Sequence, residues 1–240
     1  MKNLLLPSCL FFLLTFPVAS AQTLPGLDPN FGNGNGYVIS NVGMGDLEVL
    51  ADGKIIAGGT ALVRFLPDGG LDNSFGNAGV APLSGSGVAR QIGLQESGKI
   101  IVSRVYTDIG FEDDKKYLTR YNIDGSIDQS FGNNGYSDSV ADFGEPDKGM
   151  LIQPDGKILL ITEDDANSML QITRMTSEGL IDSSFGVNGI VLRVLGLEEI
   201  YCFDAILQPD GKIVVTGQYN SVNSGLEIFV VRLLPDGSFD

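Results

Sequence analysis

A Phe-Gly turn that recurs four times is the feature that most constrains the fold of this 240-residue chain. The pattern reads LDPNFGNGNG at 27–36, LDNSFGNAG at 71–79, IDQSFGNNG at 127–135 and IDSSFGVNG at 181–189. The four equivalent Phe residues are separated by 44, 56 and 54 positions. A period of roughly 40 to 60 residues is typical of β-propellers and similar arrays. The chain is therefore expected to fold as repeated units that pack on one another.

Two more landmarks recur in fixed order between these turns. A hairpin signal that ends in Lys reads ADGK at 51–54, ESGK at 96–99, PDGK at 154–157 and PDGK at 209–212. An Arg strand that leads into a second Gly turn reads LVRFLPDGG at 62–70, LTRYNIDGS at 118–126, ITRMTSEGL at 172–180 and VVRLLPDGS at 230–238. An Asp-Gly or Ser-Gly pair between two apolar runs indicates a β-hairpin, because glycine adopts positive φ without strain.

Each period contains about four short strand candidates. In the second copy they are residues 80–83, 88–95, 99–106 and 116–122. The run after each Lys is continuously apolar, as in Ile100-Ile101-Val102, which predicts a strand buried on both faces. No segment carries a long stripe of period 3.6, so little helix is expected. These patterns predict an all-β, propeller-like array of about four antiparallel, four-stranded blades.

The repeats differ in length mainly between the Lys and the Arg. This interval is 10 residues in the first copy and 21, 17 and 20 in the next three. The extra residues are polar and lie at 107–116, 162–168 and 218–227. Because insertions in repeat proteins map to loops on one face, which is often the binding face, we expect these three segments to form a variable loop face.

The landmarks resemble the delta-60 repeats of secreted bacterial proteins. The segments LQPDGKIVV at 207–215 and IDGSIDQSFG at 123–132 carry the resemblance, which covers about residues 24–240 in four copies. It implies propeller blades on an exported scaffold and transfers no catalytic motif. The domain is expected to span residues 22–240. Its last repeat is incomplete, because the other copies continue from the position of Asp240 to Phe-Gly. Residues 24–28 carry their own version of that turn, so we favour part of a longer propeller over a closed four-bladed ring.

Residues 1–21 have the form of a secretory signal peptide. Lys2 precedes an apolar run at 4–18, and Ala19-Ser20-Ala21 supplies a cleavage site. A membrane anchor is the alternative, but the run is short for a span and no basic cluster follows it. Cleavage removes Lys2 alone among the charged residues, so the net charge falls from −15 to −16. The expected protein is acidic and secreted or at the outer cell surface. It does not insert into a membrane after cleavage, and its charge disfavours nucleic-acid binding.

The sequence indicates no catalytic, cofactor or metal site. It has no His, which excludes His-based triads and ligands, and Cys202 is expected to be a buried free thiol. Acidic groups recur at 112–114, at 163–165 and at Asp138, Asp142, Glu145 and Asp147. Such clusters can hold Ca²⁺, but no D-x-[DN]-x-[DN]-G loop is present. Solvated surface charge is therefore favoured over calcium binding.

The recurring side chains are instead expected to be structural. Phe31, Phe75, Phe131 and Phe185 each lie next to Gly, which suggests an aromatic plug between neighbouring blades. An Arg precedes an Asp by eight residues in every copy: Arg64 and Asp72, Arg120 and Asp128, Arg174 and Asp182, Arg232 and Asp240. Residues equidistant from a hairpin turn face each other, so each pair predicts a clamp inside its own blade. The alternative is that both groups lie on the surface and are retained by turn propensity.

Three classes of function fit these features. The first is a non-enzymatic binding or scaffold module whose loop face takes a glycan, a peptide or a protein. The second is a propeller-based glycan hydrolase or lyase, which needs a pair of carboxylates that the sequence does not single out. The third is a structural spacer for a further C-terminal domain. The absence of His and of any singular polar cluster favours the binding module.

Overall fold

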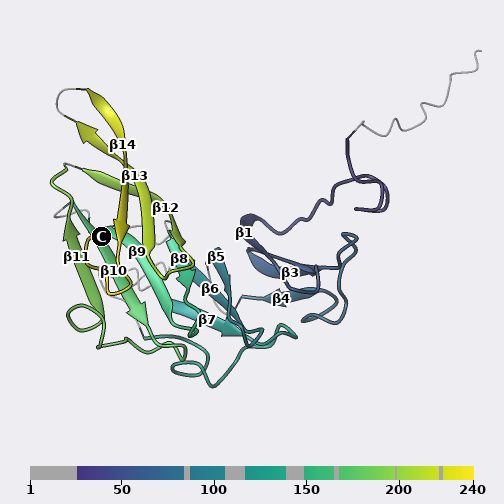
Figure 1. Ribbon diagram of the computed structural model, residues 1–240. Coiled ribbons are helices and arrows are strands. Elements are labelled where there is room, and N and C mark those ends of the chain that lie inside the picture. The colour runs from purple at the N-terminus through teal and green to yellow at the C-terminus, as the bar shows by residue number, and fades with distance from the viewer. Residues whose placement is uncertain are drawn as a thin grey trace, which may run out of the picture.

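The chain forms four antiparallel sheets arranged side by side. The computed structural model describes residues 26–83, 87–105, 117–138, 149–164, 168–197, 199–221 and 224–240. All fourteen regular elements in these ranges are strands, and no helix there is long and apolar enough to cross a membrane. Figure 1 shows the sheets fanned out in chain order from β1 to β14. The predicted all-β, propeller-like array is confirmed.

Each sheet is a meander in which every strand pairs with the next one in sequence. The first blade contains β1 (Met44–Val49), β2 (Ile55–Gly59), β3 (Ala61–Phe65) and β4 (Val80–Pro82). The second contains β5 (Val88–Leu94), β6 (Ile100–Val105) and β7 (Tyr117–Tyr121). The third contains β8 (Gly149–Ile152), β9 (Ile158–Asp164), β10 (Met169–Met175) and β11 (Ile190–Val194). The fourth contains β12 (Ile200–Leu207), β13 (Ile213–Ser221) and β14 (Gly225–Leu233).

Two sheets therefore have three strands where four were expected. In the second blade, Tyr136 forms an isolated bridge with Thr119 at the place where β4 and β11 extend the other sheets. The fourth blade ends at β14, followed by the turn that leads to Asp240. The described residues supply no further strand at the outer edge of this blade.

The turns before each Lys have the same geometry in all four blades. Gly53, Gly98, Gly156 and Gly211 adopt φ values of 81°, 79°, 81° and 83°. In the first blade the Leu50 amide donates to the Lys54 carbonyl at 2.8 Å, and the Gly53 amide donates to the Leu50 carbonyl at 2.8 Å. Glycine is needed here because side chains strain a backbone with positive φ. The hairpin signals in the sequence therefore specify these turns locally.

Neighbouring blades pack face to face, with three clusters of buried side chains between them. Ile100 and Val102 of β6 face the first blade, whereas Ile101 faces the third. Ile158 and Leu159 divide in the same way between the second and fourth blades. All five side chains are fully buried. This alternation explains why the strand after each Lys is continuously apolar in sequence: both of its faces are core.

The first strands of the blades line the inner edge of the array. β1 packs against β5, β5 against β8, and β8 against β12. The register shifts by one residue within β1, β5 and β12, which leaves Gly45, Arg90 and Phe203 as bulged positions. Bulges bend a strand and re-aim side chains, as the rim of a curved array requires.

The insertion of the fourth repeat differs from the polar loop that the sequence predicted. Residues 218–227 mostly extend the β13–β14 hairpin, whose pairing continues to Ser221 and Gly225. Tyr219 lies opposite Glu227, and its hydroxyl donates a hydrogen bond to the Glu227 carboxylate. This cross-strand pair stabilises strand geometry in a segment that composition alone assigns to a loop. Residues 1–21 and the insertion at 107–116 lie outside the described residues, as does 165–167 of the insertion at 162–168.

The recurring Phe residues pack against the next blade. Phe75, Phe131 and Phe185 are fully buried, whereas Phe31 is partly exposed, contrary to the expectation for that copy. A Cβ added at Gly125 would lie 3.0 Å from the Phe75 ring, and one at Gly179 would lie 2.5 Å from the Phe131 ring. Each ring thus sits directly on the turn glycine of the following blade. Phe31 contacts Gly69 in this way, but the described residues supply no sheet to cover its other side.

Replacing Phe75 with Ala is expected to destabilise the fold by about 3–5 kcal/mol, because the ring is fully enclosed between two blades. Phe239→Ala is the matched control, since that ring is half exposed, and its effect should be within about 1 kcal/mol. Urea unfolding of both variants measures the difference. Equal losses for the two variants would show that the buried ring is not an inter-blade plug.

Candidate functional site

An Arg–Asp pair closes the third strand of each blade onto the turn that follows. The Nε of Arg64, Arg120 and Arg174 lies 2.8 Å from the Oδ2 of Asp72, Asp128 and Asp182, respectively, and Arg232 Nε lies 2.5 Å from Asp240 Oδ2. The Asp72 amide also donates to the Arg64 carbonyl at 2.9 Å. The structure therefore brings all eight predicted residues together as four pairs, and we call each pair with its neighbours a clamp.

Two members of the clamp were missed from the sequence. The hydroxyl of Ser74 donates to Asp72 Oδ1 at 2.6 Å, and Ser130 and Ser184 do the same in their own blades at 2.7 and 2.6 Å. The Lys of each hairpin turn reaches the same carboxylate: Lys54, Lys99, Lys157 and Lys212 lie 3.4, 3.0, 3.7 and 3.0 Å from it. The available signal was the Ser that lies two residues after Asp72, Asp128 and Asp182, together with the Lys that recurs in all four copies.

The same guanidinium groups stack on the recurring Phe rings. The distance from the Arg Cζ to the ring centroid is 4.7 Å for Arg64 over Phe75, 4.7 Å for Arg120 over Phe131 and 4.4 Å for Arg174 over Phe185. A desolvated cation over an aromatic face is attracted by the ring quadrupole. The plug and the clamp, which the sequence presented as separate features, therefore form one unit.

The clamp carboxylates are held as anions. Hydrogen bonds from Ser74 and Ser184 are the largest contributions that lower the pKa of Asp72 and Asp182. For Asp128, burial opposes ionisation, but hydrogen bonds from Ser130 and Lys99 outweigh it and also lower the pKa. A carboxylate kept ionised in this way cannot serve as a general acid near neutral pH. The clamps therefore have the chemistry of structural ion pairs.

The clamps of the first and second blades also bond to the following blade. Arg64 Nη1 donates to the Ile123 carbonyl, and Arg120 Nη1 donates to the Ser177 carbonyl at 2.8 Å. The glycine after Phe31, Phe75 and Phe131 adds a backbone bond: Gly32 to Asp68, Gly76 to Asp124 and Gly132 to Glu178, at 2.7, 2.7 and 2.8 Å. One set of side chains thus fixes a turn within its own blade and docks that turn on the next blade.

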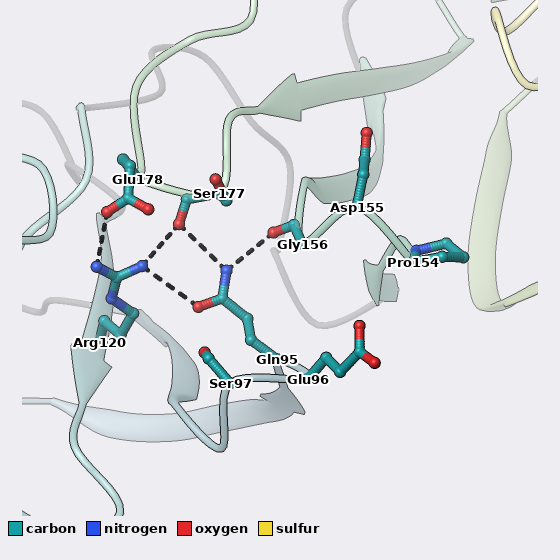
Figure 2. Close-up of a pocket in the computed structure, with 9 residues that line it drawn as sticks. All are labelled: Gln95, Glu96, Ser97, Arg120, Pro154, Asp155, Gly156, Ser177 and Glu178. Atoms are coloured by element: carbon teal, nitrogen blue, oxygen red, sulfur yellow. Dashed lines mark hydrogen bonds and ion pairs between the residues drawn. The ribbon is translucent and has the colours of Figure 1, made fainter.

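A polar pocket of about 270 Å³ lies beside the clamp of the second blade, at its junction with the third (Figure 2). Arg120 Nη2 donates to Glu178 Oε2 at 2.7 Å, and its Nη1 lies 3.3 Å from Gln95 Oε1. Gln95 Nε2 donates to the carbonyls of Gly156 and Ser177 at 2.9 and 3.1 Å. The buried polar groups of this pocket are therefore already bonded to one another.

The remaining carboxylates of the pocket do not form a catalytic pair. Figure 2 shows Glu96 and Asp155 apart from Arg120. Burial opposes ionisation of Asp155, but its hydrogen bonds with Lys157 outweigh this and lower its pKa. Asp155 also lies 3.0 Å from Lys157 Nζ in an exposed ion pair. Glycoside hydrolysis needs two carboxylates that flank the scissile bond, whereas Asp155 is taken up by its ion pair with Lys157.

The other acidic candidates fall into two groups. Among the described ones, Glu163 accepts the Cys202 amide at 3.2 Å and Asp138 accepts the Ile181 amide at 3.2 Å, so both join neighbouring blades. Residues 112–114, Asp142, Glu145, Asp147 and Asp165 lie outside the described residues. In the part of the chain that the structure describes, no three His, Cys, Asp or Glu side chains gather as metal ligands. Cys202 is buried and forms no disulfide with the residues that the structure describes, and its burial agrees with the apolar run in which it lies.

Comparison with known proteins supports the architecture. The family model described as "Domain of unknown function (DUF5122) beta-propeller" matches residues 50–75, 95–131 and 208–240. These matches support a β-propeller repeat family. They cover the Lys turn and the Arg strand of three repeats and reach the Phe of the Phe-Gly turn in two, which are the parts of the chain that build the clamps. No match is found among curated proteins.

Two solved structures are similar at the level of fold. A protein of unknown function from Dyadobacter fermentans DSM 18053 is 12% identical with a TM-score of 0.51, and the alignment covers 77% of this chain and 59% of that one. The extracellular domains 1–2 of Drosophila Semaphorin 1b are 11% identical with a TM-score of 0.52, covering 85% of this chain and 42% of that one. The chain thus spans about half the length of these two proteins. At such identities the likeness concerns fold alone.

Replacing Asp128 with Asn is expected to destabilise the protein by on the order of 3 kcal/mol, because Arg120 and Lys99 lose the charge that compensates their burial. Asp155→Asn removes an exposed pair and should change stability by less than about 1 kcal/mol. Urea unfolding at pH 7 measures both. A loss for Asp128→Asn no larger than the loss for Asp155→Asn would mean that the clamp is a surface pair.

The clamps also predict the acid sensitivity of the fold. Since folding lowers the pKa of Asp72, Asp128 and Asp182, their contribution to stability is fully present above the unfolded pKa of about 4. It is lost as the pH falls from there through the folded pKa values. The free energy of unfolding should therefore decrease from pH 5 to pH 2, and less steeply in Asp128→Asn. Parallel pH profiles for the two proteins would contradict this assignment.

Proposed function

We propose that this chain is an exported, non-enzymatic β-propeller protein of the delta-60 type that acts as a binding or scaffold module. The observation that carries the proposal is that the blades share the same clamp ion pairs but differ in their connecting loops. Most of the buried charged groups belong to the Arg–Asp pairs of the first three blades, which recur from blade to blade, with Arg104 and Glu163 as the exceptions among the described residues. A catalytic centre needs a singular arrangement, whereas a repeated one supports a scaffold role.

The variable parts lie together at one end of the strands, opposite the end that carries the clamps. In a meander, successive turns alternate between the two ends of the strands, so the Lys turns and the Phe-Gly turns lie at the same end. The connections from second to third strands and from blade to blade lie at the other end. The β13–β14 hairpin projects there beyond the neighbouring strands, as Figure 1 shows. We assign ligand binding to this loop face, with a glycan, a peptide or a protein as the ligand.

Location and other partners follow from the same proposal. The leader at 1–21 supports secretion or display at the outer cell surface, without membrane insertion after cleavage. The strongly acidic composition supports a protein that does not bind nucleic acid. No cofactor is part of the proposed function.

One observation favours a second candidate, a propeller-based glycan hydrolase or lyase. Glu48 lies on β1, at the inner edge where propeller enzymes could hold substrate. Burial and the neighbouring Asp46 raise its pKa, which is a property of a general acid. A partner carboxylate at glycosidase spacing would be required for this function.

A binding screen that also reads out turnover separates the two candidates. The purified chain is tested by biolayer interferometry against soluble polysaccharides and unstructured peptides, and the polysaccharides are assayed for new reducing ends. We expect binding without reducing-end release. Replacing residues 221–225 by Asn-Gly should weaken binding at least tenfold. Glu96→Gln, in a Lys turn at the other end of the strands, should leave binding unchanged. Reducing-end release that is lost in Glu48→Gln would instead establish the enzyme.

Calcium is expected to leave the stability unchanged, because the acidic loops lack a calcium-binding spacing. A site filled at one hundred times its dissociation constant would stabilise the fold by about 2.7 kcal/mol. In a protein of this size that would raise the melting temperature by roughly 5–10 °C. Thermal unfolding in millimolar Ca²⁺ and in EDTA tests the point. A rise of that size that EDTA reverses would reveal a calcium site.

A further inference from the structure

The Phe-Gly turn of the first repeat is one residue longer than its equivalents. From the Phe to the last Gly it reads FGNGNG at 31–36, whereas the others read FGNAG at 75–79, FGNNG at 131–135 and FGVNG at 185–189. In all four turns the amide of the last Gly donates to the carbonyl of the Phe at 2.8–2.9 Å. The longer turn contains an additional Gly, Gly34, whose amide donates a hydrogen bond to none of the described residues.

Gly34 follows an Asn, and the four Asn-Gly pairs of the sequence all lie in these turns. They are Asn33-Gly34, Asn35-Gly36, Asn134-Gly135 and Asn188-Gly189. In the last three pairs the Gly amide is the donor that closes the turn. A Cβ added to any of those three glycines would overlap the side chain of Leu27, Ile127 or Ile181, whereas the atom nearest to one added at Gly34 lies 3.7 Å away. Among the described residues, Gly34 is therefore neither held by its amide nor enclosed.

Solvent reaches the Asn side chains of the internal turns as well. Asn33, Asn134 and Asn188 are all exposed, so this exposure does not depend on where a turn lies in the array. The glycines that follow them differ, because Gly34 is exposed whereas Gly135 and Gly189 are buried. The three pairs thus share their sequence and their contact with solvent, and they differ in how firmly the glycine is held.

We propose that Asn33 is a site of spontaneous deamidation, the reaction in which an Asn side chain combines with the backbone nitrogen that follows it. The Gly34 nitrogen attacks Cγ of Asn33: a bond forms between these two atoms, the Cγ–Nδ2 bond breaks, and Nδ2 leaves as ammonia with the amide proton. Water then opens the cyclic imide. Cleavage of the new bond gives aspartate, and cleavage of the original peptide bond gives isoaspartate. No atom is oxidised or reduced, and water is the only co-reactant.

The hydrogen bond of the glycine amide decides which pair reacts, because the attacking nitrogen must lose its proton and turn towards the side chain. The amides of Gly135 and Gly189 would first have to leave their bonds to the Phe carbonyls, which is costly for a buried donor. Gly34 has no such bond to lose, and glycine passes between backbone conformations with little steric hindrance. The fold therefore protects Asn134 and Asn188 and leaves Asn33 reactive.

Deamidation changes the turn in two ways. The product carries one more negative charge, and isoaspartate adds a main-chain atom between Gly32 and Asn35, whose amide donates to the Gly32 carbonyl at 3.2 Å. The site lies at the end of the strands that carries the clamps. The inference is therefore independent of the ligand assigned to the loop face.

Peptide mapping by mass spectrometry, during incubation of the purified chain at pH 8 and 37 °C, tests the proposal. Deamidation is detected by its mass gain, and isoaspartate by methylation with an isoaspartyl methyltransferase. In the folded protein Asn33 should react at least tenfold faster than Asn134 and Asn188. In concentrated urea the three should react at similar rates, because each of them precedes Gly. Similar rates in the folded protein, or a preference for Asn33 that persists in urea, would overturn the proposal.

Deleting Gly34 supplies a matched variant. The turn then reads FGNNG, which is the sequence that residues 131–135 already have, so the variant should melt within a few degrees of wild type. Its Asn35-Gly36 pair becomes the equivalent of Asn134-Gly135, and both pairs should react slowly. Fast deamidation at Asn35 in the shortened turn would contradict the protection on which the proposal rests. If the variant does not fold, the comparison of folded and urea-unfolded wild-type chain still decides the proposal.

Discussion

The whole array depends on burying a guanidinium group next to an aromatic ring. An isolated charge in that position would be strongly destabilising, so the Asp, the Ser that orients it and the Lys behind it must all be present. Once its charge is paired, the guanidinium holds the third strand to its own turn, and those of Arg64 and Arg120 also bond to the backbone of the next blade. Unlike the apolar packing alone, these bonds are directional, and they fix how successive blades are placed.

Glycine sets how closely the blades approach. Phe75 and Phe131 rest on Gly125 and Gly179, where the space for a Cβ is occupied by the ring. Both glycines also have positive φ, at 87° and 81°, so backbone geometry and ring contact make the same demand. This double requirement explains why the turn sequence recurs in every copy while the connections on the opposite edge differ in length and composition.

The sequence predicted the parts of this structure that depend on short spacings. Turn chemistry and the alternating burial of β6 are local, and the eight-residue interval between Arg120 and Asp128 spans one turn. The bonds from Arg120 to Ser177 and Glu178 join residues more than fifty positions apart, and no local pattern indicates them. The β13–β14 extension was missed because polar composition outweighed the cross-strand pairing of Tyr219 with Glu227.

The partly exposed Phe31 shows which features of a repeat depend on a neighbouring blade. Its copy of the turn shares hydrogen bonds with buried copies, such as the one from Gly32 to Asp68, which matches the one from Gly76 to Asp124. Local geometry therefore does not depend on the sheet behind it, whereas burial of the ring does. Arg232 is another partly covered case, since its side chain is 52% exposed although it is paired with Asp240. The turn is thus specified by its own sequence, whereas burial of the ring and of the guanidinium depends on the packing of one blade against the next.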